Sequence, residues 1–276
     1  MRPVQPDRVY GFVIATENRQ TWKTPAIVLV AGCLISAVGF GARFGMGLFL
    51  DPMTVELGWN RETYALAMAL QNIAWGICLP IAGAAVDRYG SVWVIAGGAV
   101  IYALGFWGMA ISDTGGMLYL TGGVLSGAGI ACTSFTLAIA AMVRAVGPER
   151  RSLVMGLGTA AGSVGQIVFS PFAQGMIGQF GWSNGLLIMG ACTLCIIPLA
   201  LLLPNRPTLD EPDTIDLTLK AALGEAFRHR GYVLLTVGFF VCGFHVSFIM
   251  IHLPAYVADL GLSGNVAAWC LALIGV

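Results

Sequence analysis

An arginine inside an apolar stretch is the first residue of this sequence that could bind an anion. Arg43 interrupts an apolar run over residues 25–49. An ionised side chain near the middle of a membrane helix costs roughly 2.5–3.5 kcal/mol on insertion scales, so it should face a cavity or a polar partner. At 1.5 Å per residue, however, Arg43 lies only ~9 Å from the end of its run. We therefore expect it either to bind or gate an anion or to extend to the membrane surface.

Four further polar side chains interrupt apolar runs and are candidate substrate contacts. Gln71 and Asn72 lie near the middle of one run, where an unpaired amide is costly and must turn toward other helices or water. Ser134 follows a glycine-rich stretch, which indicates close helix packing first and a substrate contact second. His245 can change its charge near neutral pH. We expect it either to contact a substrate or couple a proton, or to stay neutral and bond to a neighbouring helix.

A histidine and a proline near the end of the last long apolar run predict a gate hinge. His252 lies seven residues after His245 and so on roughly the same helix face. Pro254 lacks a backbone N–H and can bend a helix.

The sequence lacks the common catalytic motifs. It has no H-E-x-x-H, no G-x-S-x-G and no P-loop lysine. All seven cysteines fall inside apolar runs, which favours helix packing over a disulfide framework or a zinc site. Asp51 and Asp259 lie at the ends of apolar runs, where a solvated carboxylate is expected. We expect no enzymatic activity, cofactor, metal or nucleic-acid partner.

The elements that must position these residues are membrane-spanning helices. The chain of 276 residues is 57% hydrophobic and only 10% charged, whereas soluble domains carry about 25% charged residues. A helix of about 20 apolar residues crosses the ~30 Å hydrocarbon core. Seven runs are near or above this length, and an eighth, from about residue 267, stops at Val276, so we expect a chain cut inside an eighth helix. The seven runs cover residues 25–49, 63–85, 92–112, 116–142, 153–178, 184–203 and 231–257.

The distribution of basic residues predicts the orientation in the membrane. Loops rich in lysine and arginine stay in the cytoplasm. Basic residues gather in residues 1–24, around Arg88, in the loop after residue 142 and in residues 204–230, whereas only Arg61 falls on the other side. This pattern predicts a cytoplasmic N-terminus in a cell membrane, either inner or plasma. We divide the chain into a cytoplasmic segment 1–24, a six-helix bundle 25–203, a cytoplasmic linker 204–230, and the start of a second bundle, 231–276.

A short charged turn joins the second and third runs. Gly83 would let a neighbouring helix approach closely, and Gly90 can adopt the backbone angles of a tight reversal. Asp87 can face helix N-termini, and together with Arg88 it forms an acid-base pair at the membrane surface. We expect these four residues to act in gating.

The same four residues resemble the G-x-x-x-D-R-x-G-[RK]-[RK] loop between helices 2 and 3 of the major facilitator superfamily of transporters. The two basic positions that usually follow are Ser91 and Val92 here. The resemblance implies an all-α membrane fold of inverted 3+3 repeats, with two six-helix bundles joined by a linker. Residues 88–97 and 179–190 show a faint internal repeat that fits this fold, although a chance similarity explains it as well.

Three segments are similar to the monocarboxylate-transporter and oxalate/formate-antiporter branch, especially its bacterial members. They are residues 43–49 (RFGMGLF), 58–61 (GWNR) and 252–263 (HLPAYVADLGLS). The branch implies transport of a small organic anion, a monocarboxylate or dicarboxylate, with protons or by exchange. It also implies a basic residue in helix 8 that would lie beyond Val276.

Within this resemblance, the partners expected are a small carboxylate, protons and the lipid bilayer. The candidate residues for substrate binding are Arg43, Gln71, Asn72, Ser134 and His245, and those for gating are Gly83, Asp87, Arg88, Gly90, His252 and Pro254. The alternative within transport is an efflux transporter for drugs or neutral solutes. A seven-helix receptor or photosensor is the alternative of another class, although the last long run has no lysine for retinal.

Overall fold

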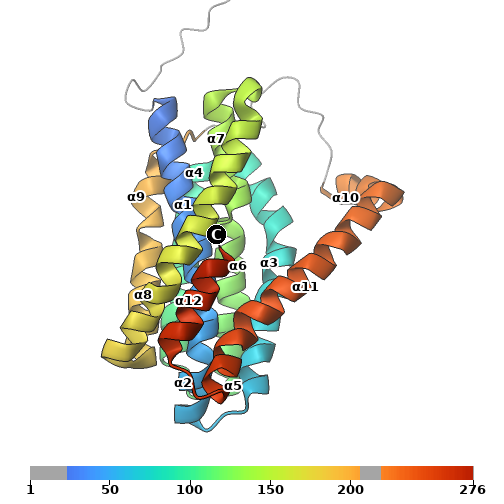
Figure 1. Ribbon diagram of the computed structural model, residues 1–276. Coiled ribbons are helices and arrows are strands. Elements are labelled where there is room, and N and C mark those ends of the chain that lie inside the picture. Colours follow the sequence, from blue (N-terminus) through green and yellow to red (C-terminus); the bar gives the residue numbers. More distant parts are fainter. Residues whose placement is uncertain (1–23, 206–218, 276) are drawn as a thin grey trace, which may run out of the picture.

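A computed structural model describes residues 24–205 and 219–275, and these residues form helices and turns without a strand (Figure 1). Residues 1–23 of the proposed segment 1–24 and residues 206–218 of the proposed linker 204–230 lie outside the described residues. Six described helices are long and apolar enough to cross a membrane. The predicted all-α membrane architecture is therefore confirmed.

The first predicted span continues well past its apolar run. Helix α1 (Pro25–Gly45) begins at Thr24, whose hydroxyl accepts a hydrogen bond from the Ile27 backbone N–H at 3.4 Å. It runs through the 3-10 turn η1 (Met46–Phe49) into α2 (Leu50–Leu57) and ends at Gly58, which has a φ of +65°. The predicted end at residue 49 is wrong because the helix continues with polar residues such as Glu56, which is exposed and does not need an apolar environment.

The charged turn of the sequence is tighter than expected. Helix α3 (Arg61–Tyr89) includes Asp87 and Arg88 in its last turn, and α4 (Ser91–Ala110) starts directly after Gly90. Gly90 has a φ of +85°, as predicted for the reversal. A Cβ atom at Gly83 would meet no atom within 4 Å, so the close helix approach predicted there is not made in this structure.

The fourth span is irregular. It comprises α5 (Gly115–Leu118), the π-helical segment η2 (Tyr119–Leu125), α6 (Ser126–Cys132) and α7 (Phe135–Val146), with a break at residues 133–134. A Cβ atom at Gly129 would lie 2.6 Å from the Cα of Tyr102. The glycine-rich stretch therefore serves close packing against α4, as predicted.

The fifth and sixth spans follow each other directly, with a chain reversal at a single glycine between them. After η3 (Pro148–Arg150), α8 (Arg151–Leu194) turns back at Gly181, where φ is +79°, and α9 (Ile196–Leu201) completes the sixth span. Cys192 and Cys195 stand in a C-x-x-C spacing here, and both are free thiols.

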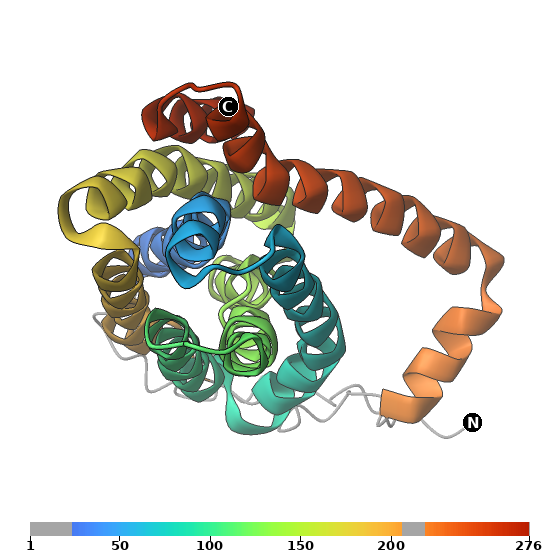
Figure 2. The ribbon, with the colours of Figure 1, turned by 90° about the horizontal axis from the view of Figure 1, so that it is seen from below.

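The last elements lie outside this bundle (Figure 2). They are α10 (Leu219–Arg228), the long helix α11 (Arg230–Asp259) and the short helix α12 (Gly264–Ile274). Viewed along the bundle, α1 to α9 form a closed group, while α11 and α12 pack outside it (Figure 2). Helix α11 leans away from α3 toward its α10 end (Figure 1).

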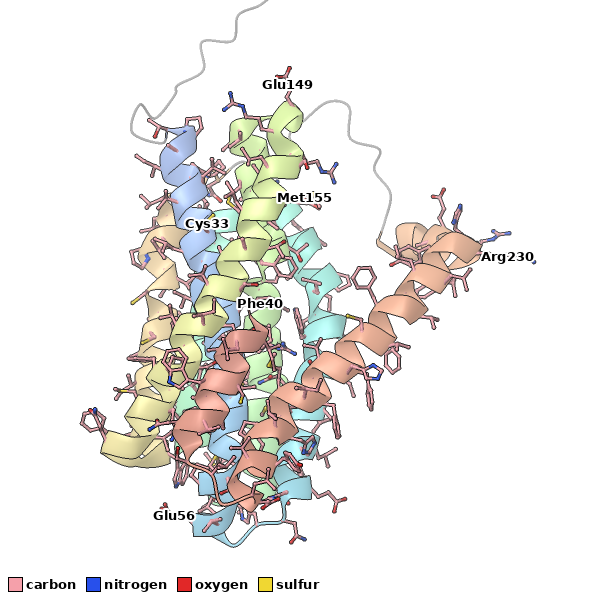
Figure 3. All side chains as sticks on the ribbon, in the orientation of Figure 1. Cys33, Phe40, Glu56, Glu149, Met155 and Arg230 are labelled. Atoms are coloured by element: carbon pink, nitrogen blue, oxygen red, sulfur yellow. The ribbon has the colours of Figure 1, made fainter. Side chains whose placement is uncertain are left out.

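The buried core has two layers along the bundle. One layer, around Phe49, Tyr64 and Phe106, lies toward the end of the molecule where α2 meets α3. The other, around Ile35, Ile95 and Met142, lies toward the opposite end. Glu56 marks the first end and Glu149 the second, and we call them the Glu56 end and the Glu149 end (Figure 3).

Candidate functional site

The guanidinium of Arg43 lies between α1 and α3. Its Nη2 donates a hydrogen bond to Asn72 Oδ1 at 2.6 Å. Its Cζ lies 4.8 Å from the centre of the Trp75 ring and 5.6 Å from that of Phe44, within the range of cation–π attraction. The structure thus directs Arg43 inward, and the alternative in which it extends to the membrane surface is wrong.

Asn72 is held in one orientation. Its Nδ2 donates to the backbone carbonyl of Met68 at 2.8 Å, which leaves Oδ1 to accept from Arg43. The hydroxyl of Ser247, on α11, lies 3.5 Å from the same Oδ1. Of the two amides, Gln71 and Asn72, that we expected to bond between helices, Asn72 thus also contacts α11.

Arg43 has no anionic partner among the described residues. Its Nε is buried without a hydrogen-bond partner, and Asn72 is a neutral amide. Arginine keeps its proton in proteins, so this site carries a positive charge with unused donor capacity.

A small cavity of about 20 Å³ adjoins the guanidinium. This volume holds about one water molecule. Its walls combine a few polar groups with methionine side chains: Arg43, Met46, Gln71, Asn72, Ser247 and Met250. The cavity lies where α1 and α3 meet α11, so a change in the position of α11 would change its size.

Gln71 lines the cavity but is engaged in helix contacts. Its Nε2 donates to the backbone carbonyl of Gly122 at 3.0 Å and lies 3.0 Å from the sulfur of Met46. Gly122 belongs to the π-helical segment η2. The predicted hydrogen bond of Gln71 to another helix is therefore confirmed. Its contact with a substrate stays a prediction.

Ser134 does not line the cavity. It precedes α7, is 1% exposed, and its hydroxyl has no hydrogen-bond partner in the described structure. The neighbouring Phe135 ring lies 4.9 Å from that of Phe40, which lies 6.1 Å from Trp75. Phe40 stands midway along the bundle (Figure 3). Aromatic contacts thus run from Phe135, the residue after Ser134, through Phe40 to Trp75 beside Arg43.

The two histidines of α11 are not brought to the cavity. His245 is exposed, and its Nδ1 lies 2.8 Å from the carbonyl of Val241 within the same helix. His252 is half-buried, with its ring 4.8 Å from that of Phe248. Pro254 is buried in an α11 that continues to Asp259. Substrate contact and gating by these residues stay predictions.

The structure also joins residues that sequence reasoning left apart. Asp51 and Asp259 both pair with Arg61, at 3.0 and 2.6 Å, so the expectation of simply solvated carboxylates is wrong. Gln166 of α8, 4% exposed, donates to the carbonyl of Leu271 in α12 at 2.6 Å. The sequence signal for the Arg61 pairs was that Arg61 and the two aspartates have opposite charges and stand at ends of apolar runs on the same predicted side of the membrane.

Comparison with known proteins gives the fold a family. Residues 32–276 match the Major Facilitator Superfamily. Monocarboxylate transporter 11 of Homo sapiens is 29% identical over 248 residues, covering 90% of this chain and 52% of that protein. Monocarboxylate transporter 4 of Gallus gallus is 26% identical, covering 96% and 58%. The chain spans about half the length of these curated relatives.

Solved structures share the fold at lower sequence identity. A variant of the nucleoside transporter NupG superposes with a TM-score of 0.73 at 13% identity, covering 90% of this chain and 64% of that one. A bacterial homologue of the human lysosomal transporter Spinster gives 0.70 at 19%, covering 91% and 59%. The family match over most of the chain, together with this fold, shows that the chain belongs to the Major Facilitator Superfamily of membrane transporters.

Proposed function

We propose that this chain forms part of a secondary transporter that binds a small organic carboxylate at Arg43 and moves it by alternating access. The observation that carries the proposal is the buried guanidinium, whose hydrogen-bond partner is the neutral amide of Asn72 and whose Nε has none. A carboxylate would supply the negative charge that this group lacks, because charge-assisted bonds between guanidinium and carboxylate are among the strongest in proteins. The similarity to monocarboxylate transporters supports the same class of substrate.

The cavity walls favour a substrate with one carboxylate and a short apolar remainder. Arg43 is the one cationic residue that lines the described cavity, and five of the other nine lining residues have large apolar side chains: Phe44, Met46, Met68, Met250 and Ile251. A dicarboxylate would place its second charge against these apolar walls, which is costly without a partner. Within this chain we therefore favour a monocarboxylate over a dicarboxylate.

Binding in this proposal requires α11 to move. A cavity of about 20 Å³ is too small for a carboxylate, since it holds about one water molecule. Ser247 and Met250 of α11 form one of its walls. Displacement of α11 and the second bundle would widen the site, and a substrate that binds the wider arrangement better would shift the population toward it.

The remaining parts of the proposal follow the charge pattern of the sequence. The N-terminus and the 204–230 linker lie in the cytoplasm of a cell membrane, and residues 231–276 begin the second bundle. Asp87 and Arg88, in the last turn of α3, latch the cytoplasmic side when the transporter faces outward. Transport is coupled to protons or proceeds by exchange, and His245 is the titratable candidate on α11.

Equilibrium binding and uptake of a labelled carboxylate test the proposal. Radiolabelled butyrate is offered to the purified protein and to proteoliposomes, with unlabelled acetate, oxalate and uridine as competitors. We expect Arg43→Gln to weaken binding about 10- to 100-fold, the range of one lost hydrogen bond to a charged group. The control Arg228→Gln alters an exposed arginine of α10 and should bind normally.

Two results would remove this proposal. Undiminished binding by Arg43→Gln would exclude Arg43 from the site, and stronger competition by uridine than by acetate would favour a neutral substrate. Arg43→Lys keeps the positive charge but loses the planar guanidinium group. Its affinity for butyrate should therefore lie between that of the unaltered protein and that of Arg43→Gln.

A further inference from the structure

The contacts of α11 with the six-helix bundle lie at one end of this helix. Residues 230–246 are exposed, whereas Met250, Pro254, Ala255 and Val257 are buried. Figure 1 shows the same arrangement, with α11 beside α2 at the Glu56 end and apart from the bundle at its α10 end. Arg230 accordingly stands far from the bundle (Figure 3). The two parts of the molecule are therefore closed together at the Glu56 end.

The backbones of the two parts meet closely beside the cavity. A Cβ atom at Gly47, in η1, would overlap the backbone carbonyl of Met250 in α11. Glycine is thus needed for α11 to lie this close to η1. The closed arrangement therefore depends on glycine at position 47 as well as on the packing of the helices.

A cluster of three charged residues closes the same end. Arg61 Nη1 and Nη2 donate to the two carboxylate oxygens of Asp259 at 2.6 and 2.7 Å, which is a bidentate pair. Arg61 Nη2 also donates to Asp51 Oδ1 at 3.0 Å. Asp51 and Arg61 belong to α2 and α3, whereas Asp259 is the last residue of α11.

We propose that Arg61, Asp51 and Asp259 form a latch that holds α11 against the six-helix bundle at the Glu56 end. Asp51 keeps Arg61 oriented within its own bundle, and the bidentate pair with Asp259 joins that bundle to α11. Opening at this end requires the bidentate pair to break. The proposal goes beyond the carboxylate site, because the latch acts whatever the substrate is.

Loss of the Arg61–Asp259 pair should change the free energy of opening only slightly, yet change the populations of the closed and open arrangements measurably. The side chains of Arg61, Asp51 and Asp259 are 42%, 33% and 55% exposed. Exposed ion pairs contribute little free energy because water and salt screen their charges. Removing one such pair changes an equilibrium constant by up to about fivefold. Such an effect shifts the populations of two arrangements that have similar free energies.

A distance measurement between two spin labels tests the latch without any substrate. Labels are attached at Asn60→Cys and Leu262→Cys, which are exposed and lie beside the latch, in a protein whose seven cysteines are replaced by serine. We expect one short distance in the otherwise unaltered protein. In Arg61→Gln, the ratio of molecules with a long label distance to molecules with a short one should rise about two- to fivefold. Asp259→Asn should have the same effect.

Charge exchange and a control separate pairing from a general loss of structure. Combining Arg61→Asp with Asp259→Arg should restore the short distance, whereas Arg230→Gln, at the exposed end of α11, should leave it unchanged. Circular dichroism and gel filtration confirm folding. About 1 M salt should lengthen the distance in the unaltered protein but not in Arg61→Gln, because salt screens exposed charges.

The proposal is overturned if Arg61→Gln and Asp259→Asn both keep the distance distribution of the unaltered protein. It is also overturned if the double exchange behaves like Arg61→Gln while remaining folded. Neither result depends on transport, so failure of the carboxylate proposal and failure of the latch are distinguishable.

Discussion

The two ends of α3 carry charged turns that make different contacts. At the Glu149 end, the turn at Gly90 bonds to the end of the sixth span: Ser91 Oγ donates to the carbonyl of Pro204 at 2.8 Å, and the Val92 N–H donates to Asn205 Oδ1 at 3.3 Å. At the Glu56 end, Arg61 bonds to α11, 198 residues along the chain. The first turn thus bonds to the segment that follows the sixth span, whereas the second joins α3 to α11.

Sequence resemblance does not distinguish the two turns, whereas their contacts do. The Gly90 turn resembles a loop of the whole superfamily, and Ser91 and Val92 bond to Pro204 and Asn205, directly after the sixth span. The Arg61 turn belongs to the GWNR segment, which resembles one branch of that superfamily, and Arg61 forms the described ion pair with Asp259 of α11. The predictions below test whether the two ends are as different as these contacts indicate.

The largest expected effect is that of Gly90→Ala. Gly90 has a φ of +85° and a ψ of 158°, a region almost restricted to glycine, and its Cβ would overlap the side chain of Asn205. We expect the folded state to lose about 1–3 kcal/mol of stability, measured as a lower melting temperature in detergent micelles. Gly58→Ala is the matched control, because Gly58 lies in the left-handed helical region with open space around it. An equal or greater loss for Gly58→Ala would contradict the comparison.

Asn205→Ala should have a moderate effect. It removes the acceptor for the Val92 N–H, and one hydrogen bond contributes about 1 kcal/mol net. The double variant with Gly90→Ala should lose less than the sum of the two, since Asn205 no longer obstructs the new methyl group. Strict additivity of the two melting shifts would show that Asn205 and Gly90 do not interact.

Ser247→Ala should have the smallest effect. Its hydroxyl lies 3.5 Å from Asn72 Oδ1, at the outer limit of a hydrogen bond. We expect a change in stability of less than about 0.5 kcal/mol, and an unchanged distance between labels at positions 60 and 262. A larger displacement of α11 in Ser247→Ala than in Arg61→Gln would mean that the two parts are held together at the carboxylate site and not at the Glu56 end.

The membrane spans were predictable because each depends on a local property. A helix must keep its side chains apolar over the whole hydrocarbon thickness, so the length of an apolar run reveals it. The reversals at Gly90 and Gly181 were recognisable for a similar reason, since each glycine stands between two such runs. The extension of the first span to Leu57 was not, because a helix end in water no longer depends on apolar residues.

The candidate site was predictable in part. A buried arginine must find a partner, and the sequence offered Asn72 among the polar residues of the next span. The separation of His245 and Ser134 from the cavity was not predictable, because it depends on the rotation of α11 and on the break before Phe135. These are properties of packing between helices and leave no pattern along one of them.

By itself, the sequence determined that this chain crosses the membrane repeatedly, where Arg43 interrupts a span, and where the backbone must reverse. Each of these follows from the cost of placing a particular group in lipid or in a restricted conformation. Only the tertiary structure decided that Arg43 bonds to Asn72 and that Arg61 bonds to Asp259. A charge specifies that a partner is needed, but which of many distant residues meets it depends on how the helices pack.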